Sequence, residues 1–599
     1  MIKLAIGLAL ILIHFLLVIL FKDKRDGFFY VFSGLIGFST IFFILLLWLH
    51  IFYYSILFSI YFLIDLIVIF YVHKKVGFNG MRTNLFNVKV DWMLVFILIV
   101  LLIEFGSVHF NYTGKITFSD GIREVSNFKS VYPYYSDEWS AIALIKYSID
   151  SNSLPFVNPL FENSPFPNPE FVFHSFLSGL ILFFGLGILS SYSYFALFFG
   201  VIICILFYSL LRYNNVSKIN SGIACLFLPF IVNGANLPGF WYLIPLTLGI
   251  VCMLLGCIFI SMNNKKLGLT TGFLILLFYP PLFVFYTFIF LCFVYFSDIS
   301  INTKLRYFLF YFGICFLVAI LIFIGLFAIG PFSLSNTISY VFSKIAYSIF
   351  TENAIPDYYI WKIIPIPILL LGFFGIFINL KDKTKYWLVA PIVIGFAYWF
   401  IYSSVLWRFI IEYQRVVFTT SLLIVCFSGY ALEYLYEKSK NFKYFKRYNL
   451  FFILQIVILI LLFVFSFTYT KNERWNELKL KHIEDNREFS PNPPASNYLI
   501  DEDISLFKNI NKSRFLSTPW KGLVIGAATG NYPLDSKSST ITVNFLTSSR
   551  FMNSNCSDKK KLANEYGINY VYLSKFDCES FEFIGKSSEE FYLYKFINE

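Results

Sequence analysis

Charge is what this 599-residue sequence has least of. Only 14% of its residues are charged, whereas a soluble globular protein carries about 25%. Hydrophobic residues make up 58% of the chain, and they gather in many long runs. Runs of about 18 residues or more are long enough to cross a bilayer as helices. The composition therefore excludes a soluble globular protein, and we expect a polytopic α-helical membrane protein.

The sequence also lacks a zinc-binding pattern, internal repeats and low-complexity tracts. No Cys-x-x-Cys pair and no Cys/His spacing typical of zinc occurs among its nine cysteines. Most of them sit in apolar runs, where cysteine behaves as a small hydrophobic residue. Cys556 and Cys578 alone lie in a polar region. They would form one disulfide if that region faces an oxidising compartment.

The basic residues are distributed unevenly. Residues 471–599 hold 17 basic and 17 acidic side chains, so the formal charge of +11 belongs entirely to the apolar part, with 30 basic and 19 acidic. Lysine and arginine concentrate in the cytoplasmic loops of membrane proteins. The pattern indicates membrane topology and argues against nucleic-acid binding.

We expect about 13 membrane spans, with the N-terminus outside. The apolar runs that predict them are 2–21, 28–49, 51–72, 92–108, 171–189, 194–211, 219–261 (two), 268–296, 306–329, 359–379, 386–406, 416–435 and 450–469. Tyr279-Pro280-Pro281 should break one run into two half-spans or a hairpin. The crossings between residues 171 and 267 do not add up, so one segment there should lie in the interface.

Three regions follow from this topology. Residues 1–75 form an N-terminal transmembrane appendage, residues 92–470 a transmembrane module, and residues 471–599 an extracytoplasmic α/β domain. The tail should contain strands at 515–518, 523–526, 540–544 and 570–573, and a hairpin of 581–584 with 591–596. A helix over 558–566 should begin with an acidic cap and end at Gly567.

The polar loop 109–170, also outside, contains the adjacent acids Asp137 and Glu138. They open a run, 138–149, whose apolar residues recur on one helical face. These residues are Trp139, Ile142, Ile145 and Ile149. We expect a helix lying on the membrane surface. Its N-terminus favours carboxylates, and Asp137 could be simply the cap of that helix.

The loop then returns through five prolines to His174. The prolines are Pro155, Pro159, Pro165, Pro167 and Pro169. Prolines restrict the backbone, so the return should be rigid and held against the membrane surface. The arrangement of acid pair, surface helix, proline-rich return and apolar span resembles the first external loop of the GT-C glycosyltransferases. It is most similar to the protein mannosyltransferase and aminoarabinose transferase branch, over roughly residues 92–470.

The resemblance implies an inverting glycosyltransferase with a polyprenyl-phosphate sugar as donor. The acceptor would be an extracytoplasmic glycan, lipid or protein. Asp137 takes the place of the catalytic carboxylate of that family, with Glu138 beside it. A base must remove the proton of the acceptor hydroxyl as it attacks the anomeric carbon. The sequence has no Trp-Trp-Asp motif, which argues against the oligosaccharyltransferase branch.

The leaving phosphate needs a cation. Arg408 and Arg415 stand at the outer head of a late span, against the usual inward bias of positive charge. The alternative is that both arginines only snorkel to the interface. Glu104, near the outer end of its span, and His174 are further candidates for substrate binding. No metal ligand set is evident, although a divalent cation, Mg²⁺ or Mn²⁺, is compatible with the chemistry.

Two other functions fit a chain of this kind. A transporter or flippase of lipid-linked saccharide should show repeats and charges near the middle of the membrane. Asp65 is the acid that falls mid-span here, and a hydrogen bond between helices is its simpler explanation. A membrane-anchored binding protein, with the tail as its active part, is the other alternative.

Overall fold

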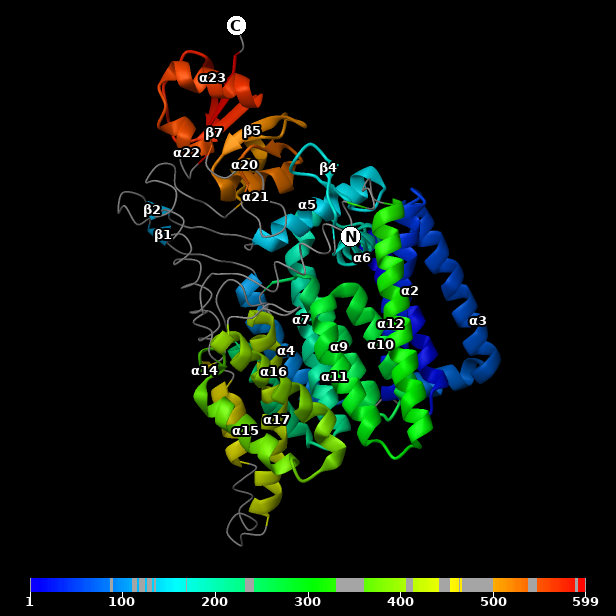
Figure 1. The fold of residues 1–599 in the computed structure, drawn as a ribbon. Coiled ribbons are helices and arrows are strands. Elements are labelled where there is room, and N and C mark those ends of the chain that lie inside the picture. Colours follow the sequence, from blue (N-terminus) through cyan, green and yellow to red (C-terminus); the bar gives the residue numbers. More distant parts are fainter. Residues whose placement is uncertain are drawn as a thin grey trace.

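An apolar helical bundle carries a smaller α/β region at one end, and the C-terminus lies beyond that region (Figure 1). The computed structural model describes residues 2–86, 90–109, 116–117, 124–125, 132–133, 136–168, 170–231, 242–329, 335, 360–405, 413–440, 453–462, 464–465, 499–536, 547–587 and 591–597. Strands β1 (Ile116–Thr117) and β2 (Glu124–Val125) pair antiparallel within the loop 109–170.

Within these residues, six helical segments are long and apolar enough to cross a membrane. They are α1 (Ile2–His14) with η1 (Phe15–Leu20), α2 (Lys24–Trp48), α3 (Tyr54–Phe86), α7 (Ile188–Tyr213), η3 (Lys383–Lys385) with α16 (Tyr386–Val405), and α17 (Tyr413–Ser439). The prediction of an apolar helical bundle is confirmed. The count of about 13 spans and the division into three regions stay predictions.

The other helices of the bundle are not among these six. They are α4 (Trp92–His109), α6 (Phe171–Phe184), α8 (Lys218–Cys225) with η2 (Leu228–Phe230), α9 (Pro245–Ser261), α10 (Lys265–Phe278), α11 (Pro280–Phe296), α12 (Ile301–Ile329), α14 (Ile360–Ile363) and α15 (Ile366–Asn379). The expected break at Tyr279-Pro280-Pro281 is confirmed, since α10 ends and α11 begins there.

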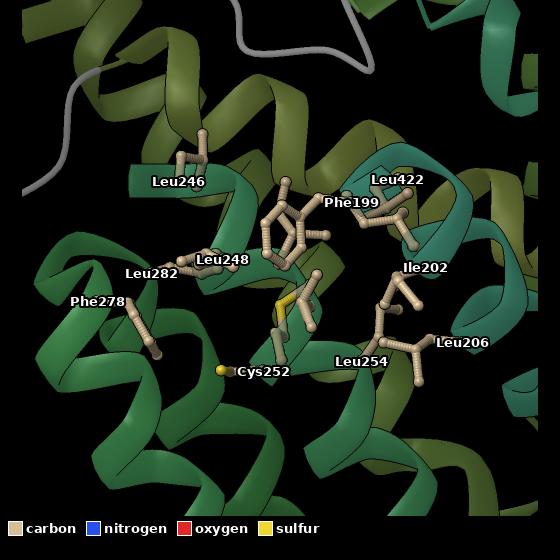
Figure 2. Packing of buried hydrophobic residues seen from close by; sticks show 14 of the residues in the cluster. Phe199, Ile202, Leu206, Leu246, Leu248, Cys252, Leu254, Phe278, Leu282 and Leu422 are labelled. Atoms are coloured by element: carbon tan, nitrogen blue, oxygen red, sulfur yellow. The ribbon is translucent and has the colours of Figure 1, made fainter. Parts of the chain in front are cut away.

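The core of the bundle forms where α7, α9, α10, α11 and α17 meet. Figure 2 shows Phe199, Ile202 and Leu206 of α7 facing residues of α9, with Leu422 of α17 beside them. Close helix contact depends on glycine in places. A Cβ on Gly375 of α15 would lie 1.9 Å from the Phe427 carbonyl of α17, so a side chain there would force the two helices apart.

The two ends of the bundle are defined by polar contacts. At the end nearer the α/β region, which we call the loop end, the Asn152 side chain bonds the backbone of His50 and Phe52. The opposite, lysine end carries Lys218, which pairs with Asp91 at 3.4 Å. The Tyr213 hydroxyl donates to Asp26 at the same end.

Helix α6 does not run from one end of the bundle to the other. Its first residue, Phe171, packs on Phe156 at the loop end, and Gly185 after its last turn lies against Lys3. Lys3 in turn lies over the ring of Tyr54, the first residue of α3, next to the α2–α3 connection. The expectation of a span at 171–189 is therefore wrong.

The mid-span acid Asp65 has a partner. Its carboxylate lies 2.7 Å from Nδ1 of His14, and both side chains are buried. The pair joins α3 to α1 within the N-terminal helices. Nearby, the hydroxyls of Tyr61 and Ser39 are 2.6 Å apart. Asp65 thus serves helix packing, as the simpler explanation had it.

The tail folds around a five-stranded sheet in the order β6-β5-β7-β9-β8. The strands are β5 (Arg514–Ser517), β6 (Tyr532–Pro533), β7 (Tyr570–Leu573), β8 (Phe581–Lys586) and β9 (Tyr592–Phe596). The first three are parallel, and β9 joins β7 and β8 antiparallel. The helices are α20 (Asp501–Leu506), α21 (Pro519–Thr529), α22 (Thr547–Met552) and α23 (Cys556–Tyr566).

Most expectations for the tail hold, and two need correction. The strand at 523–526 is wrong, because these residues lie within α21, which starts at Pro519 and is buried on nearly every side. A helix buried all round shows the same unbroken apolar run as a buried strand. The cap of α23 is Asn555, whose side chain accepts from the Asp558 amide. The strand expected at 540–544 lies outside the described residues.

A fully buried ion pair holds the α/β region together. Lys521 Nζ of α21 lies 2.6 Å from Asp503 of α20, and the Tyr572 hydroxyl donates to the same carboxylate at 2.6 Å. A buried charge that loses its partner is strongly destabilising. Of the three acids that begin α20, Asp503 is thus a buried structural residue, whereas Asp501 and Glu502 are exposed.

Cys556 and Cys578 form a disulfide that ties the start of α23 to the segment after β7. Replacing both with serine should cost this region about 3 kcal/mol, because the closed loop of this size restricts the unfolded chain. Protease resistance of the purified full-length chain during heating would measure the loss. A reducing agent should weaken the wild type to the same degree and leave the double variant unchanged. If the reductant weakened both equally, the disulfide would not be the cause.

Candidate active site

The acid pair lies in the first turn of α5 (Ser136–Ser151). Asp137 is half-buried, whereas the Glu138 side chain is buried. Asp137 is the second described residue of the helix and belongs to its first turn. The helix dipole favours a carboxylate at this place. The pair is thus held at a helix N-terminus, as expected, but its two members have different surroundings.

Helix α5 is not a surface helix, and that expectation is corrected. Residues on all its sides are buried, from Glu138 through Ile145. It lies between the helical bundle and α21 of the tail (Figure 1), and its apolar residues share one core with Leu523, Val524 and Ala527. The amphipathic pattern predicted the helix correctly. It could not reveal the second layer, because that layer comes from a segment some 380 residues later in the chain.

Polar contacts join the loop to the tail along this interface. Lys146 Nζ donates to the Ala528 carbonyl at the end of α21, at 2.8 Å. Burial lowers the pKa of Lys146, and Asp150 partly offsets this. The Tyr132 hydroxyl donates to Asp501 at 2.7 Å, and burial together with that carboxylate raises the pKa of Tyr132 to about 12.

The proline-rich return is a small hairpin rather than a strap on the membrane surface. Strands β3 (Val157–Asn158) and β4 (Ser164–Pro165) pair antiparallel. Between them, Glu162 forms an ion pair with Arg514 of β5, and the buried Leu160 packs against Gly526 of α21. The return is therefore held by the tail.

Glu138 binds backbone rather than solvent. Its Oε1 accepts a hydrogen bond from the Leu243 amide at 3.1 Å. The carbonyl of the same residue accepts one from the Tyr192 hydroxyl at 2.7 Å. Leu243 immediately precedes α9, and Tyr192 belongs to the second turn of α7. The contact thus ties α5, α7 and α9 to one another.

Four helices begin around this point. The N-termini of α5, α7 and α9 meet through the contacts of Leu243. Glu170 stands at the N-cap position of α6. The carboxylates of Glu138, Asp137 and Glu170 all lie near enough to the Tyr192 hydroxyl to act on it electrostatically. The positive ends of helix dipoles offset the repulsion among such acids.

His174 helps to hold the return of the loop. Its Nδ1 lies 3.1 Å from the amide nitrogen of the buried Asn168. That amide also donates to the Pro155 carbonyl, and its oxygen accepts from the Glu170 amide. These bonds fix the start of α6 and with it Glu170. The role of His174 in substrate binding stays a prediction.

Glu104 and Arg415 stand on other helices than the acid pair. Glu104, in α4, is buried and acts electrostatically on Cys204 of α7. Cys204 follows Tyr192 by about 18 Å of helical rise. Glu104 therefore faces the middle of α7. Arg415 is half-buried in the first turn of α17, and Arg408 lies outside the described residues.

Tyr192, Glu170 and Asn168 were not predicted from the sequence. Glu170 directly precedes an apolar run, which is a usual signal for a cap, and Asn168 stands between two prolines. Tyr192 gave no signal among 41 tyrosines. As for metals, no three His, Cys, Asp or Glu side chains converge as a metal site within the described parts of the chain.

Comparison with known proteins gives no family. No family model and no curated protein matches the sequence. Among solved structures, the chain is similar to the oligosaccharyltransferase AglB of Archaeoglobus fulgidus in complex with an inhibitory peptide and a dolichol-phosphate. The TM-score is 0.45 at 13% identity, over 80% of this chain and 69% of that chain.

Two further structures of the Archaeoglobus fulgidus oligosaccharyltransferase match similarly. One is tethered to an acceptor peptide containing the NVT sequon, with a TM-score of 0.45 at 12% identity over 80% of this chain and 69% of that chain. The other is a complex with Zn and sulfate, with a TM-score of 0.45 at 14% identity over 84% and 73%. At such values the likeness carries no argument about what this chain does.

The packing of α21 on the loop can be tested at Gly526. A Cβ there would lie 2.8 Å from Pro533 and 2.9 Å from Leu160. Gly526→Ala should therefore lower the stability by about 1–3 kcal/mol through overpacking, measured by thermal unfolding of the full-length protein in detergent. The control is Gly34→Ala in α2, where no atom lies within 4 Å. Equal stability of the two variants would contradict the tight contact.

Proposed function

We propose that the chain is an inverting glycosyltransferase that moves a sugar from a polyprenyl-phosphate donor to an extracytoplasmic acceptor. The observation that carries the proposal is the half-buried Asp137 at the N-terminus of α5. It lies where the apolar bundle meets the α/β tail. A lipid-linked donor would present its sugar at that boundary, with the lipid in the bilayer and the acceptor arriving from water.

Asp137 is the general base in this proposal. Its carboxylate would take the proton of the acceptor hydroxyl as the oxygen attacks the anomeric carbon. Attack in one step from the face opposite the phosphate inverts that carbon. Glu138 does not compete for the role, because its buried carboxylate accepts the Leu243 amide.

Arg415 is the proposed contact of the donor phosphate, together with Arg408. A guanidinium binds phosphate with two parallel hydrogen bonds. Arg415 stands in the first turn of α17. Glu433 near the other end of that helix bonds Ser217 and Asn220 at the lysine end, so Arg415 lies about 27 Å of helical rise toward the loop end. Glu104 and His174 stay candidates from the sequence alone, because both are buried and Glu104 faces the middle of α7.

The acceptor is a glycan, a lipid or a protein, and the tail contributes to its binding. Support comes from the way α21 and α5 share one core, which puts the tail beside the proposed base. A divalent cation, Mg²⁺ or Mn²⁺, would assist the phosphate as leaving group. The orientation, with the loop end and the tail outside the cell membrane, is part of the proposal and rests on the lysines and arginines of the opposite end.

Asp137→Asn should lower glycosyl transfer by about 100- to 10,000-fold, because the variant lacks the base. The assay is transfer from a radiolabelled polyprenyl-phosphate sugar by the purified full-length protein. Asp298→Asn, an exposed acid at the lysine end, is the control and should transfer normally. Normal transfer by a well-folded Asp137→Asn variant would exclude the catalytic role. Binding of the donor without any transfer by the wild type would favour a flippase or a binding protein.

Arg415→Ala should raise the KM for the donor about tenfold or more, since a hydrogen bond to a charged group contributes about 1.5–3 kcal/mol. The kcat should change less, because the base is untouched. Steady-state kinetics at varied donor concentration separates the two constants. The matched control is Arg306→Ala, an exposed arginine at the start of α12. An unchanged KM in Arg415→Ala would remove Arg415 from the phosphate site.

A further inference from the structure

Two buried polar groups hold the backbone of Leu243, one at its amide and the other at its carbonyl. The Glu138 carboxylate accepts its amide at 3.1 Å, and the Tyr192 hydroxyl donates to its carbonyl at 2.7 Å. Leu243 and Tyr192 are fully buried, and Glu138 is 3% exposed. Three segments distant in sequence thus meet in two hydrogen bonds that water does not reach.

A carboxylate is a costly choice for such a contact. An uncharged side chain could accept one amide hydrogen without the cost of burying a charge. Here the cost is offset locally, because Glu138 lies in the first turn of α5 and next to the start of α9. Both helix ends favour a negative charge. Bonds to charged groups are also shorter and stronger than bonds between neutral groups, so the contact is well suited to hold a fixed distance.

The position of Glu138 bears directly on Asp137. Neighbouring residues of an α-helix point about 100° apart around the axis. Once Glu138 is anchored to Leu243, the rotation of the first turn of α5 is set, and the direction of the Asp137 side chain with it. The Tyr192 bond fixes the next peptide unit, through the carbonyl of the same residue. Movement of either partner would therefore turn or shift Asp137.

We propose that Glu138 and Tyr192 are positioning residues. They clamp the backbone of Leu243 and so fix the direction of the Asp137 side chain for the reaction. The inference rests on the proposed function for its kinetic consequence, but the clamp itself can be measured without any transfer assay. Neither residue touches the reacting atoms. Glu138, expected from the sequence to share the catalytic role, acts here through the backbone of α9.

The kinetic experiment compares four variants of the full-length protein. Glu138→Gln keeps an oxygen that can accept the Leu243 amide, so kcat should fall by no more than about threefold. Glu138→Ala and Tyr192→Phe should each lower kcat about 10- to 100-fold by misplacing the base, with little change in donor KM. The double variant Glu138→Ala/Tyr192→Phe should lose no more kcat than the worse single variant, since both bonds hold the backbone of one residue, Leu243. The pH profile of Tyr192→Phe should match the wild type.

Hydrogen–deuterium exchange supplies the independent measurement. The amides of residues 242–247 should exchange faster in Glu138→Ala and Tyr192→Phe than in the wild type. Asp137→Asn should leave that exchange unchanged. So should Tyr295→Phe, which removes a hydroxyl from an exposed tyrosine of α11 and should also keep wild-type kcat.

Two results would overturn the clamp. One is unchanged exchange at 242–247 in both Glu138→Ala and Tyr192→Phe. The other is a loss of kcat in Glu138→Gln as large as in Asp137→Asn, which would make the carboxylate a chemical participant. Faster exchange in a protein that transfers no sugar, or whose Asp137→Asn variant transfers normally, would support the clamp and reject the proposed function. The experiments therefore distinguish failure of the clamp from failure of the proposed function.

Discussion

The structure at the loop end depends on the backbone of one residue, Leu243, whose amide is bonded to a carboxylate and whose carbonyl is bonded to a hydroxyl. Through it the first turns of α5, α7 and α9 come together, and α6 joins them through Glu170. Helix N-termini attract negative charge. Their convergence explains how three carboxylates occupy one small region at the edge of an apolar bundle, where isolated acids would be costly.

This constraint makes the loop and the tail a single unit. Helix α5 is covered on one side by the bundle and on the other by α21, so neither the loop nor the tail can bury its apolar face alone. The contacts of Lys146, Tyr132 and Glu162 with the tail follow the same interface. In the proposed function one substrate comes from lipid and the other from water, and this interface would lie between the two.

Much of the fold could be predicted from the sequence, because its signals are local. Apolar runs predicted the helices, the Tyr279-Pro280-Pro281 break fell where α10 gives way to α11, and alternation predicted β5, β7 and the final hairpin. Predictions failed where a distant segment decides the outcome. The run 523–526 forms a helix because α5 covers it, and 171–189 stays at one end because its neighbours at Lys3 and Phe156 lie there. The role of Tyr192 could not be predicted for the same reason, since its hydrogen-bond partner Leu243 lies 51 residues away.

The two members of the acid pair have different surroundings because neighbouring residues of a helix point in different directions. Because successive side chains diverge by about 100°, Asp137 and Glu138 cannot serve one site together. Glu138 points to Leu243 and is buried, which removes it from contact with any substrate. Asp137 is only half-buried, so it is the member of the pair that the proposal makes the base. An acid pair in sequence thus resolves into a structural anchor and a candidate base, and the anchor makes the direction of the base predictable.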